Sequence, residues 1–203
     1  MIIVGLTGIL GSGKSTVAAA LRRRGLDVID FDALAKESLT WKETQEDIRE
    51  AFGDEYVVGG RVDIERLRQT VFAKGPNVRK LETIVHPRVH EEVERRLVAL
   101  EEKGVKAAII EHPLLFEVGF HGPVDRIIVV TAKDEIIRER LEKRGMKADD
   151  VERRLSFQIP LKEKEEKADF VIDNNGAEDR LGEQIDSLVQ RITKWEEIGH
   201  ASK

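Results

Sequence analysis

Short apolar runs alternate along this chain with charged, helix-forming stretches. Three runs rich in β-branched residues lie at 2–6, 107–110 and 126–130, and two shorter ones lie at 28–29 and 170–172. Continuous apolar runs of this kind are typical of parallel strands that are buried on both faces. The alternation therefore predicts an α/β fold, a doubly wound parallel sheet of about five strands with its ligand at the carboxyl ends of the strands.

The stretch 40–103 differs from the rest because it is helical and charged, with only a possible turn at Val58–Arg61. We interpret it as a helical insertion that carries a second substrate. The chain then forms one domain, with a nucleotide-binding core at 1–39 and 104–203 and a lid at 138–167. The C-terminal stretch is expected to form an amphipathic helix with Leu181, Ile185, Leu188, Val189 and Ile192 on its inner face.

Composition narrows the classes of partner. The 203 residues include 34 basic and 39 acidic ones, a net charge of -5, which gives no global attraction to nucleic acid or to anionic membranes. The sequence has no cysteine, which excludes disulfides and thiolate metal sites. No apolar run approaches the roughly 18 residues that a membrane span requires. We expect a cytoplasmic protein, a monomer or weak homo-oligomer, with a small-molecule substrate and neither nucleic-acid nor membrane partners.

The most specific motif is Gly8–Ser15, which satisfies G-x-x-x-x-G-K-[ST] directly after an apolar run. Such a loop binds phosphates through backbone N–H groups and through the N-terminus of the helix that follows. Lys14 is expected to reach the β- and γ-phosphates of ATP, and Ser15 to complete the Mg²⁺ shell. The predicted ATP contacts in this loop are Gly11, Ser12, Gly13, Lys14, Ser15 and Thr16.

Carboxylates follow two of the predicted strands. Asp30 and Asp32 close the run 28–29, where one of them could simply cap a helix that begins near Ala33. Asp32 is the better candidate for a catalytic base, since it lies nearer the helix and strand alternation would turn it to the same side as Asp30. Glu111 ends the run 107–110, where phosphate-loop enzymes place a carboxylate that holds Mg²⁺ through water.

Three further patterns carry less specific signals. Arg140 and Arg144 are four residues apart and would share a helix face, either in surface ion pairs or toward a polyphosphate, and we favour the polyphosphate. His86-Pro87 predicts a helix start, with proline at the first position. His86 and His90 form an H-x-x-x-H pair, but no third ligand accompanies them, so zinc is disfavoured.

Taken together, these separated motifs resemble the dephospho-CoA kinase family over residues 3 to about 195. The matching segments are Gly5–Gly8, Gly11–Ala18, Asp30-Phe31-Asp32, His86-Pro87, Pro113–Glu117, Arg140 with Arg144, Gln158 and Ala168–Gly176. The chain departs from the usual pattern at Ile9 (usually Gly), Phe31 (usually Ala), Ile64 (usually basic) and a shortened stretch near 39–47.

The resemblance implies transfer of the γ-phosphate of ATP to the ribose 3′-hydroxyl of dephospho-CoA, the last step of coenzyme A biosynthesis. It implies that Asp32 is the catalytic base, assisted by Lys14 and Arg140. Arg140 and Arg144 would belong to a lid over ATP, and Asn175-Gly176 would lie near adenine. The implied acceptor site contains Asp32, His86, Leu115, Phe116 and Glu117.

Other classes of protein also use such a loop. A nucleotide kinase shares the lid arginines but does not account for Pro113–Glu117 beside Asp30–Asp32. A GTP-dependent switch requires an N-K-x-D guanine selector, and the segment at 174–177 lacks its Lys and Asp. In a motor or assembly ATPase, the rate of ATP turnover would not respond to a small acceptor. The sequence leaves the selectivity for ATP over GTP and the metal preference open.

Overall fold

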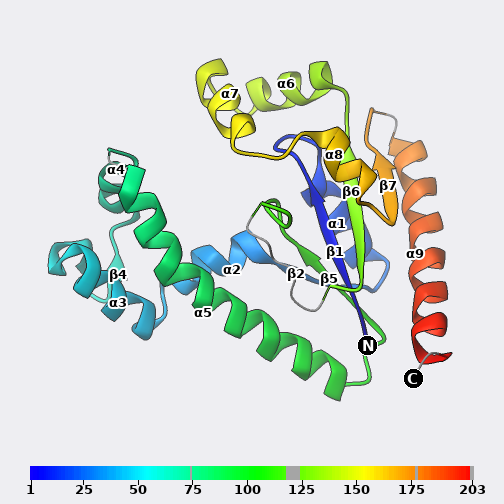
Figure 1. The fold of residues 1–203 in the computed structure, drawn as a ribbon, viewed down its shortest axis with the longest axis horizontal. Coiled ribbons are helices and arrows are strands. Elements are labelled where there is room, and N and C mark those ends of the chain that lie inside the picture. The colour runs from blue at the N-terminus through cyan, green and yellow to red at the C-terminus, as the bar shows by residue number, and fades with distance from the viewer. Residues whose placement is uncertain (74, 118–123, 177, 202–203) are drawn as a thin grey trace. The chain divides into compact units, whose positions relative to one another are not determined.

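The computed structural model describes residues 1–73, 75–117, 124–176 and 178–201. It divides into two compact units, drawn as a ribbon in Figure 1. The sheet unit comprises Met1–Asp30 and Leu100–Lys203, and the helical unit comprises Phe31–Ala99. The expected insertion was 40–103, so the unit found here begins and ends earlier along the chain.

Within the described part of the sheet unit, five strands form one sheet in the order β2-β5-β1-β6-β7, and each neighbouring pair is parallel. The strands are β1 (Ile2–Gly8), β2 (Asp27–Asp30), β5 (Ala107–Glu111), β6 (Arg126–Thr131) and β7 (Phe170–Asp173). The doubly wound sheet predicted from the apolar runs is confirmed. Because the strands are parallel, all their carboxyl ends lie at one edge, where ligands bind in such sheets.

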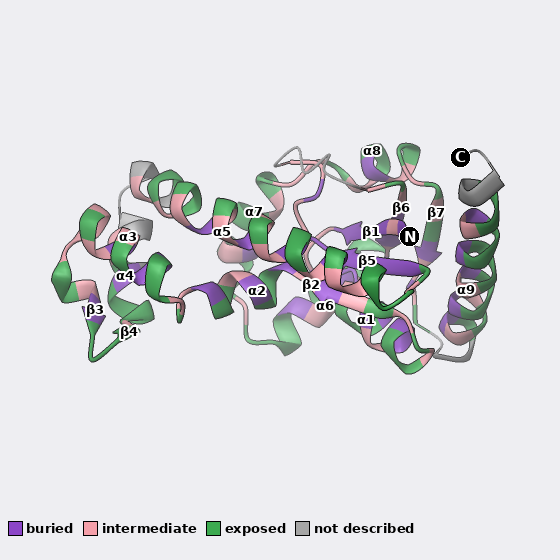
Figure 2. Ribbon diagram, turned by 90° about the horizontal axis from the view of Figure 1, so that it is seen from below, coloured by how far each residue is buried: buried purple, intermediate pink, exposed green. Residues whose placement is uncertain are grey.

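One face of the sheet packs against α1 (Lys14–Arg23) and α9 (Glu178–Ala201). The amphipathic pattern of the C-terminal stretch is confirmed, since Leu181, Ile185, Leu188 and Ile192 are buried in this core. Trp195 is buried with them. Figure 2 shows buried residues along the strands and along one side of α9.

The expected lid consists of three helices, α6 (Asp134–Lys143), α7 (Ala148–Ser156) and α8 (Leu161–Glu166). Ala132, Ile137, Leu141 and Val151 form a small apolar cluster there, and Ile9 and Leu10 of the phosphate loop pack against it. The unusual Ile9 therefore contributes to the contact between the loop and these helices.

The helical unit is built around Ile48, Val57 and Leu67. Its elements are α2 (Phe31–Ser38), α3 (Lys42–Phe52), the 3₁₀ turn η1 (Asp54–Tyr56), β3 (Val57–Val58), β4 (Arg61–Val62), α4 (Ile64–Ala73) and α5 (Gly75–Glu102). The turn predicted at Val58–Arg61 is confirmed as a hairpin. Gly59 and Gly60 have φ of +56° and +72°, the pair of positive values that a type I′ turn requires.

The predicted helix start at His86-Pro87 is wrong, because Pro87 lies inside α5. Val85, Val89, Val93 and Leu97 are all buried and recur every four residues on both sides of the proline. Burial of this continuous apolar stripe outweighs the backbone hydrogen bond that an interior proline removes.

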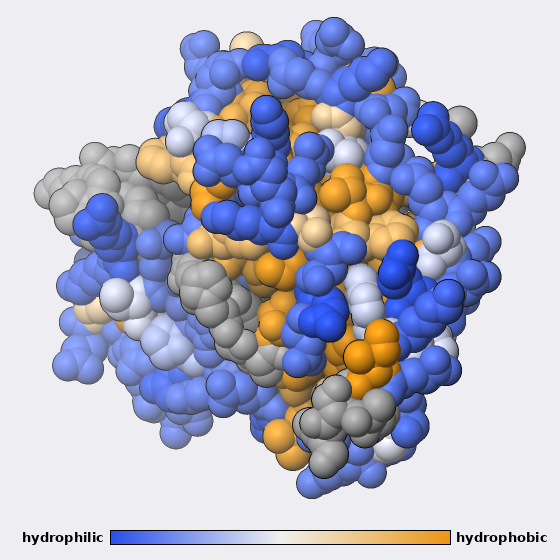
Figure 3. Space-filling view, turned by 45° about the vertical axis from the view of Figure 1, so that its right-hand side comes forward, coloured by the Kyte–Doolittle hydropathy of each residue, from blue (hydrophilic) through white to orange (hydrophobic). Residues whose placement is uncertain are grey.

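Most of the face shown in Figure 3 is hydrophilic, as expected of a chain in which 36% of the residues are charged. Among the described helices, none combines the length and the apolar character needed to cross a bilayer.

Candidate active site

The phosphate loop joins β1 to α1, and its glycines are required by geometry. Gly11 and Gly13 have φ of +81° and +96°, values that other residues rarely adopt. A Cβ on Gly13 would also lie 2.0 Å from Nδ2 of Asn174. Gly13 is the N-cap of α1, so the positive end of this helix begins at the loop, as the motif predicts.

Lys14 is the first residue of α1, and its side chain turns back over the loop. Its Nζ donates hydrogen bonds to the carbonyl oxygens of Gly8 (3.1 Å) and Ile9 (3.0 Å). The ammonium group is thus held on the loop itself, where a polyphosphate would lie on the backbone N–H groups.

Ser15 and Thr16 follow in the first turn of α1 and are exposed. The Ser15 hydroxyl donates to Oε1 of Glu111 over 3.1 Å, which brings together the two residues predicted to serve Mg²⁺. Glu111 is 5% exposed, and among the described residues its Oε2 has no hydrogen-bond partner. Burial raises the pKa of Glu111, as does the carboxylate of Asp30, whereas Ser15 and Lys14 lower it.

These donors fit a hard divalent cation, which prefers carboxylate and hydroxyl oxygens and keeps several waters. A buried carboxylate oxygen without a protein partner is the group that a cation or its water would satisfy. The described residues contain no cluster of three or more His, Cys, Asp or Glu side chains that could hold a metal. A cation here would therefore share its shell with phosphates.

Asn174, directly after β7, fixes the phosphate loop, a role that the sequence did not reveal. Its Nδ2 donates to the carbonyl of Ser12 over 2.8 Å, and the side chain is nearly fully buried. Nη1 of Arg140 donates to the same carbonyl over 3.3 Å, and Nη2 donates to the carbonyl of Asn174 over 2.9 Å. Two side chains thus hold one loop carbonyl, and one of the two residues is itself bound by the other. The only signal in the sequence was the position of Asn174 directly after β7.

The two lid arginines have different environments. Arg140 lies on α6 and is held at the phosphate loop, where its charge is close to the place expected for the phosphates. Arg144 is the C-cap residue of α6 and is exposed. Only Arg140 is therefore brought to the loop in this structure.

Asn175 and Gly176, the residues expected near adenine, follow β7 at the same edge of the sheet. Oδ1 of Asn175 accepts the backbone N–H of Lys133 over 2.6 Å, and its own N–H donates to Asp173. The turn after β7 is thereby joined to the start of α6.

The segment after β5 contains three of the predicted acceptor residues. Leu115 is 2% exposed, and its Cδ2 would lie 3.0 Å from a Cβ on Gly5, so its side chain packs on the sheet in this structure. Phe116 is half-buried and lies beneath the ammonium groups of Lys164 and Lys167. Glu117 is engaged by Lys164 at 2.7 Å and by the N–H of Ile159 at 2.9 Å.

Asp32 and His86 belong to the helical unit. Asp32 lies in the first turn of α2 and is exposed. The strand-alternation argument that paired it with Asp30 was wrong, because α2 already begins at Phe31. Phe31 is buried, and its ring makes edge contacts with His86 and His90, with centroids 6.1 and 5.5 Å away. Burial and the neighbouring His86 lower the pKa of His90.

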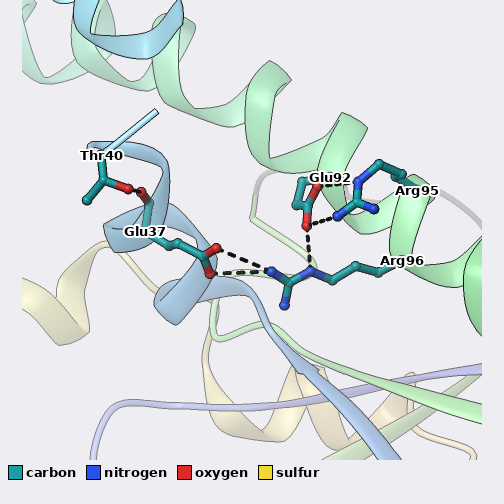
Figure 4. A network of polar contacts seen from close by, with 5 residues as sticks. All are labelled: Glu37, Thr40, Glu92, Arg95 and Arg96. Carbon is teal, nitrogen blue, oxygen red and sulfur yellow. Dashed lines mark hydrogen bonds and ion pairs between the residues drawn. The ribbon is translucent and has the colours of Figure 1, made fainter. Parts of the chain in front are cut away.

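A polar network fixes α2 to α5 in the helical unit (Figure 4). Arg96 donates to Oε1 of Glu92 over 2.6 Å and forms an ion pair with Glu37 of α2 at 3.3 Å. Arg95 donates to both carboxylate oxygens of Glu92 over 2.7 Å. Hydrogen bonds from the two arginines lower the pKa of Glu92, and Arg95 has the larger effect. Burial of the carboxylate raises the pKa and so acts against them. The helix that carries Asp32 is thereby held to the helix that carries His86.

The dephospho-CoA kinase family model matches residues 2–179. A dephospho-CoA kinase of Bdellovibrio bacteriovorus is 38% identical over 194 residues, which cover 95% of this chain and 94% of that protein. The crystal structure of TT1252 from Thermus thermophilus has a TM-score of 0.79 at 36% identity, covering 94% of this chain and 97% of that one.

A more distant structure shares the fold alone. Shikimate kinase from Acinetobacter baumannii has a TM-score of 0.55 at 14% identity over 96% of this chain and 94% of its own. The fold is therefore that of the phosphate-loop kinases. The match of the family model to most of the chain, together with the relatives at more than a third identity, shows that this chain belongs to the dephospho-CoA kinase family.

Proposed function

We propose that this protein transfers the γ-phosphoryl group of ATP to the ribose 3′-hydroxyl of dephospho-CoA, giving ADP and coenzyme A. Membership of the family makes the chain an ATP-dependent phosphotransferase that acts on a hydroxyl group. The single observation that carries the proposal is the family match over residues 2–179, which includes the complete phosphate loop.

The sheet unit supplies the ATP site in this proposal. Backbone N–H groups of Gly11–Thr16 bind the β- and γ-phosphates, and Lys14 moves from the loop carbonyls to the phosphate oxygens. Arg140 adds positive charge at the loop, where negative charge is redistributed during transfer. Arg144 reaches the nucleotide only if its exposed side chain turns toward it. Asn175 and Gly176 contact adenine.

Ser15 and Glu111 would hold Mg²⁺, Ser15 directly and Glu111 through water, in keeping with their mutual hydrogen bond. When bound, the ion neutralises phosphate charge and orients the triphosphate. The orphaned Oε2 of Glu111 supports this assignment, because a buried carboxylate oxygen without a partner is costly.

Asp32 accepts the proton of the 3′-hydroxyl and directs its oxygen at the γ-phosphorus. Asp32 lies at an exposed position in the first turn of α2. Phe31 packs on His86 and His90, which fixes the start of α2 and therefore the backbone of the adjacent Asp32. His86 and Phe116 contribute acceptor contacts, whereas Leu115 and Glu117 hold the segment after β5 in place through their buried contacts.

We further infer that the protein acts in the cytoplasm as a monomer or weak homo-oligomer, on small molecules alone. A chain without cysteine suits a reducing compartment, although it does not require one.

The decisive experiment uses purified protein, ATP, Mg²⁺ and a panel of acceptors that includes dephospho-CoA, shikimate and nucleoside monophosphates. Mass spectrometry should find one added phosphate on dephospho-CoA alone, and fragmentation should place it on the ribose 3′-oxygen. Phosphate transfer to another acceptor, with none to dephospho-CoA, would contradict the proposed function.

A further inference from the structure

One lysine in the region predicted to be a lid is not on the surface. The side chain of Lys164, on α8, has 0% exposure, and that of Glu117 has 10%. Their Nζ and Oε1 atoms are 2.7 Å apart. Lys164 also donates to the carbonyl of Pro113 over 3.3 Å and lies 5.8 Å from the centre of the Phe116 ring. Basic and acidic residues alternate densely along 134–167, so the burial of one of these lysines is a finding of the structure.

A buried ion pair seldom adds stability, because the cost of desolvating both charges offsets their attraction. Burial lowers the pKa of Lys164, and the contact with Glu117 opposes that effect. Buried pairs are well attested as devices that fix the register of two elements. The pair here joins α8 to the segment after β5, which carries residues of the proposed acceptor site.

Neighbouring residues extend the connection to the phosphate loop. Oε1 of Gln158 accepts the N–H of Leu10 over 2.8 Å, and Oε1 of Glu117 accepts the N–H of the next residue, Ile159, over 2.9 Å. Gln158–Lys164, which we call the lid anchor, therefore contacts the ATP loop at one end and the segment after β5 at the other.

We propose that the lid anchor, through the buried pair of Lys164 and Glu117, holds α6 and α7 over the phosphate loop in the position that keeps water from the γ-phosphate. Lys164 is a positioning residue in this account, and it acts through Glu117 and Pro113. This inference rests on the proposed function. It adds that the buried pair helps to decide whether the ribose 3′-hydroxyl or water receives the phosphoryl group.

Two reactions compete at the γ-phosphorus. In transfer, the 3′-oxygen forms the new P–O bond, the bond from phosphorus to the β,γ-bridging oxygen breaks, ADP leaves and the hydroxyl proton passes to Asp32. In hydrolysis, water takes the place of the 3′-hydroxyl and inorganic phosphate is released with ADP. A displaced lid admits water and raises the share of hydrolysis.

The test is the fraction of ATP lost to water, measured as inorganic phosphate over total ADP in the presence of saturating dephospho-CoA. This fraction is independent of how much protein is folded, so loss of stability alone does not change it. Lys164→Met should raise the fraction at least about fivefold. Lys162→Met, an exposed lysine on the same helix, is the matched control and should leave the fraction at the wild-type value.

Because Lys164→Met leaves a carboxylate buried without its partner, that variant could fail to fold. The double variant Glu117→Gln with Lys164→Met removes both charges. Its melting temperature should be close to that of the wild type, while the fraction of ATP lost to water should still be raised. Gln158→Ala, which breaks the contact with Leu10, should raise the fraction to a smaller extent. Faster hydrogen exchange at residues 8–12 in these variants would support the same conclusion without a measurement of activity.

If the folded variants lose the same fraction of ATP to water as Lys162→Met, the pair is merely structural and the inference is overturned. A wild-type protein that does not phosphorylate dephospho-CoA would instead contradict the proposed function.

Discussion

The sheet unit and the helical unit hold their proposed functional residues in different ways. In the sheet unit, the phosphate loop is fixed by hydrogen bonds from distant segments, such as Asn174 and Arg140 on the carbonyl of Ser12. In the helical unit, Asp32 is exposed on α2, which is held by ring contacts and by partly exposed ion pairs such as Arg96 with Glu37.

This difference indicates separate tasks. Buried hydrogen bonds preorganise the loop for one polyphosphate geometry, which favours binding and charge stabilisation. Exposed ion pairs contribute little individually and tolerate adjustment. We therefore expect changes in the sheet unit to affect ATP binding, and changes around Asp32 to affect turnover alone.

The largest effect is expected from Lys14→Ala. The ammonium group meets the phosphates in both the ground state and the transition state, so kcat/KM should fall by about 10³-fold, with much weaker ATP binding. Steady-state kinetics and calorimetry measure the two effects. Lys194→Ala, an exposed lysine on α9, is the control. Undiminished ATP affinity in Lys14→Ala would refute the assignment of the loop.

Asp32→Asn tests the helical unit. Removal of a general base should lower kcat by about 10²-fold or more, while calorimetry should find ATP affinity nearly unchanged. Asp54→Asn, at an exposed position of the same unit, should retain full activity. Unchanged turnover in Asp32→Asn would show that this residue is not part of the mechanism. If ATP affinity fell together with kcat, the proposed division of ATP binding and turnover between the two units would be contradicted.

Asn174→Ala sharpens the comparison within the sheet unit. Loss of the amide donor frees the Ser12 carbonyl, and ATP affinity should fall by about tenfold, the equivalent of about 1.4 kcal/mol. The KM for the acceptor should not change. Calorimetry with ATP and kinetics with varied dephospho-CoA separate the two quantities, and a variant that alters the acceptor KM instead would contradict the role assigned to Asn174.

The smallest effect is expected from Glu92→Gln, at most about 1 kcal/mol of stability at pH 7. The pKa of Glu92 in the folded protein is lowered from 4.5, so its ion pairs add stability above that value and lose it as the pH falls through the folded pKa. The difference in melting temperature between wild type and Glu92→Gln should be largest at pH 7, and it should become smaller as the pH is lowered below 4.5. A difference that stays constant with pH would show that the charge of Glu92 contributes no stability.

Local patterns predicted much of the fold. The apolar runs predicted the five strands of the sheet, and the glycines at 59 and 60 predicted a turn, because strand burial and turn geometry are encoded in neighbouring residues. The helix start predicted at Pro87 was wrong, because local chemistry favours a start there while the buried stripe from Val85 to Leu97 continues through the proline. Asp32 was placed on a strand because the boundary to α2 lies only two residues earlier, at Asp30.

The sequence by itself determined the sheet, the phosphate loop with Lys14 and Ser15, and the family to which the chain belongs. Only the tertiary structure revealed that Asn174 and Arg140 hold one carbonyl of the loop, 162 and 128 residues away along the chain, and that Lys164 is buried against Glu117. The reason is physical. Periodicity and motifs record what each residue requires of its neighbours in sequence, whereas the partner of a buried polar group is selected by the folding of distant segments onto it.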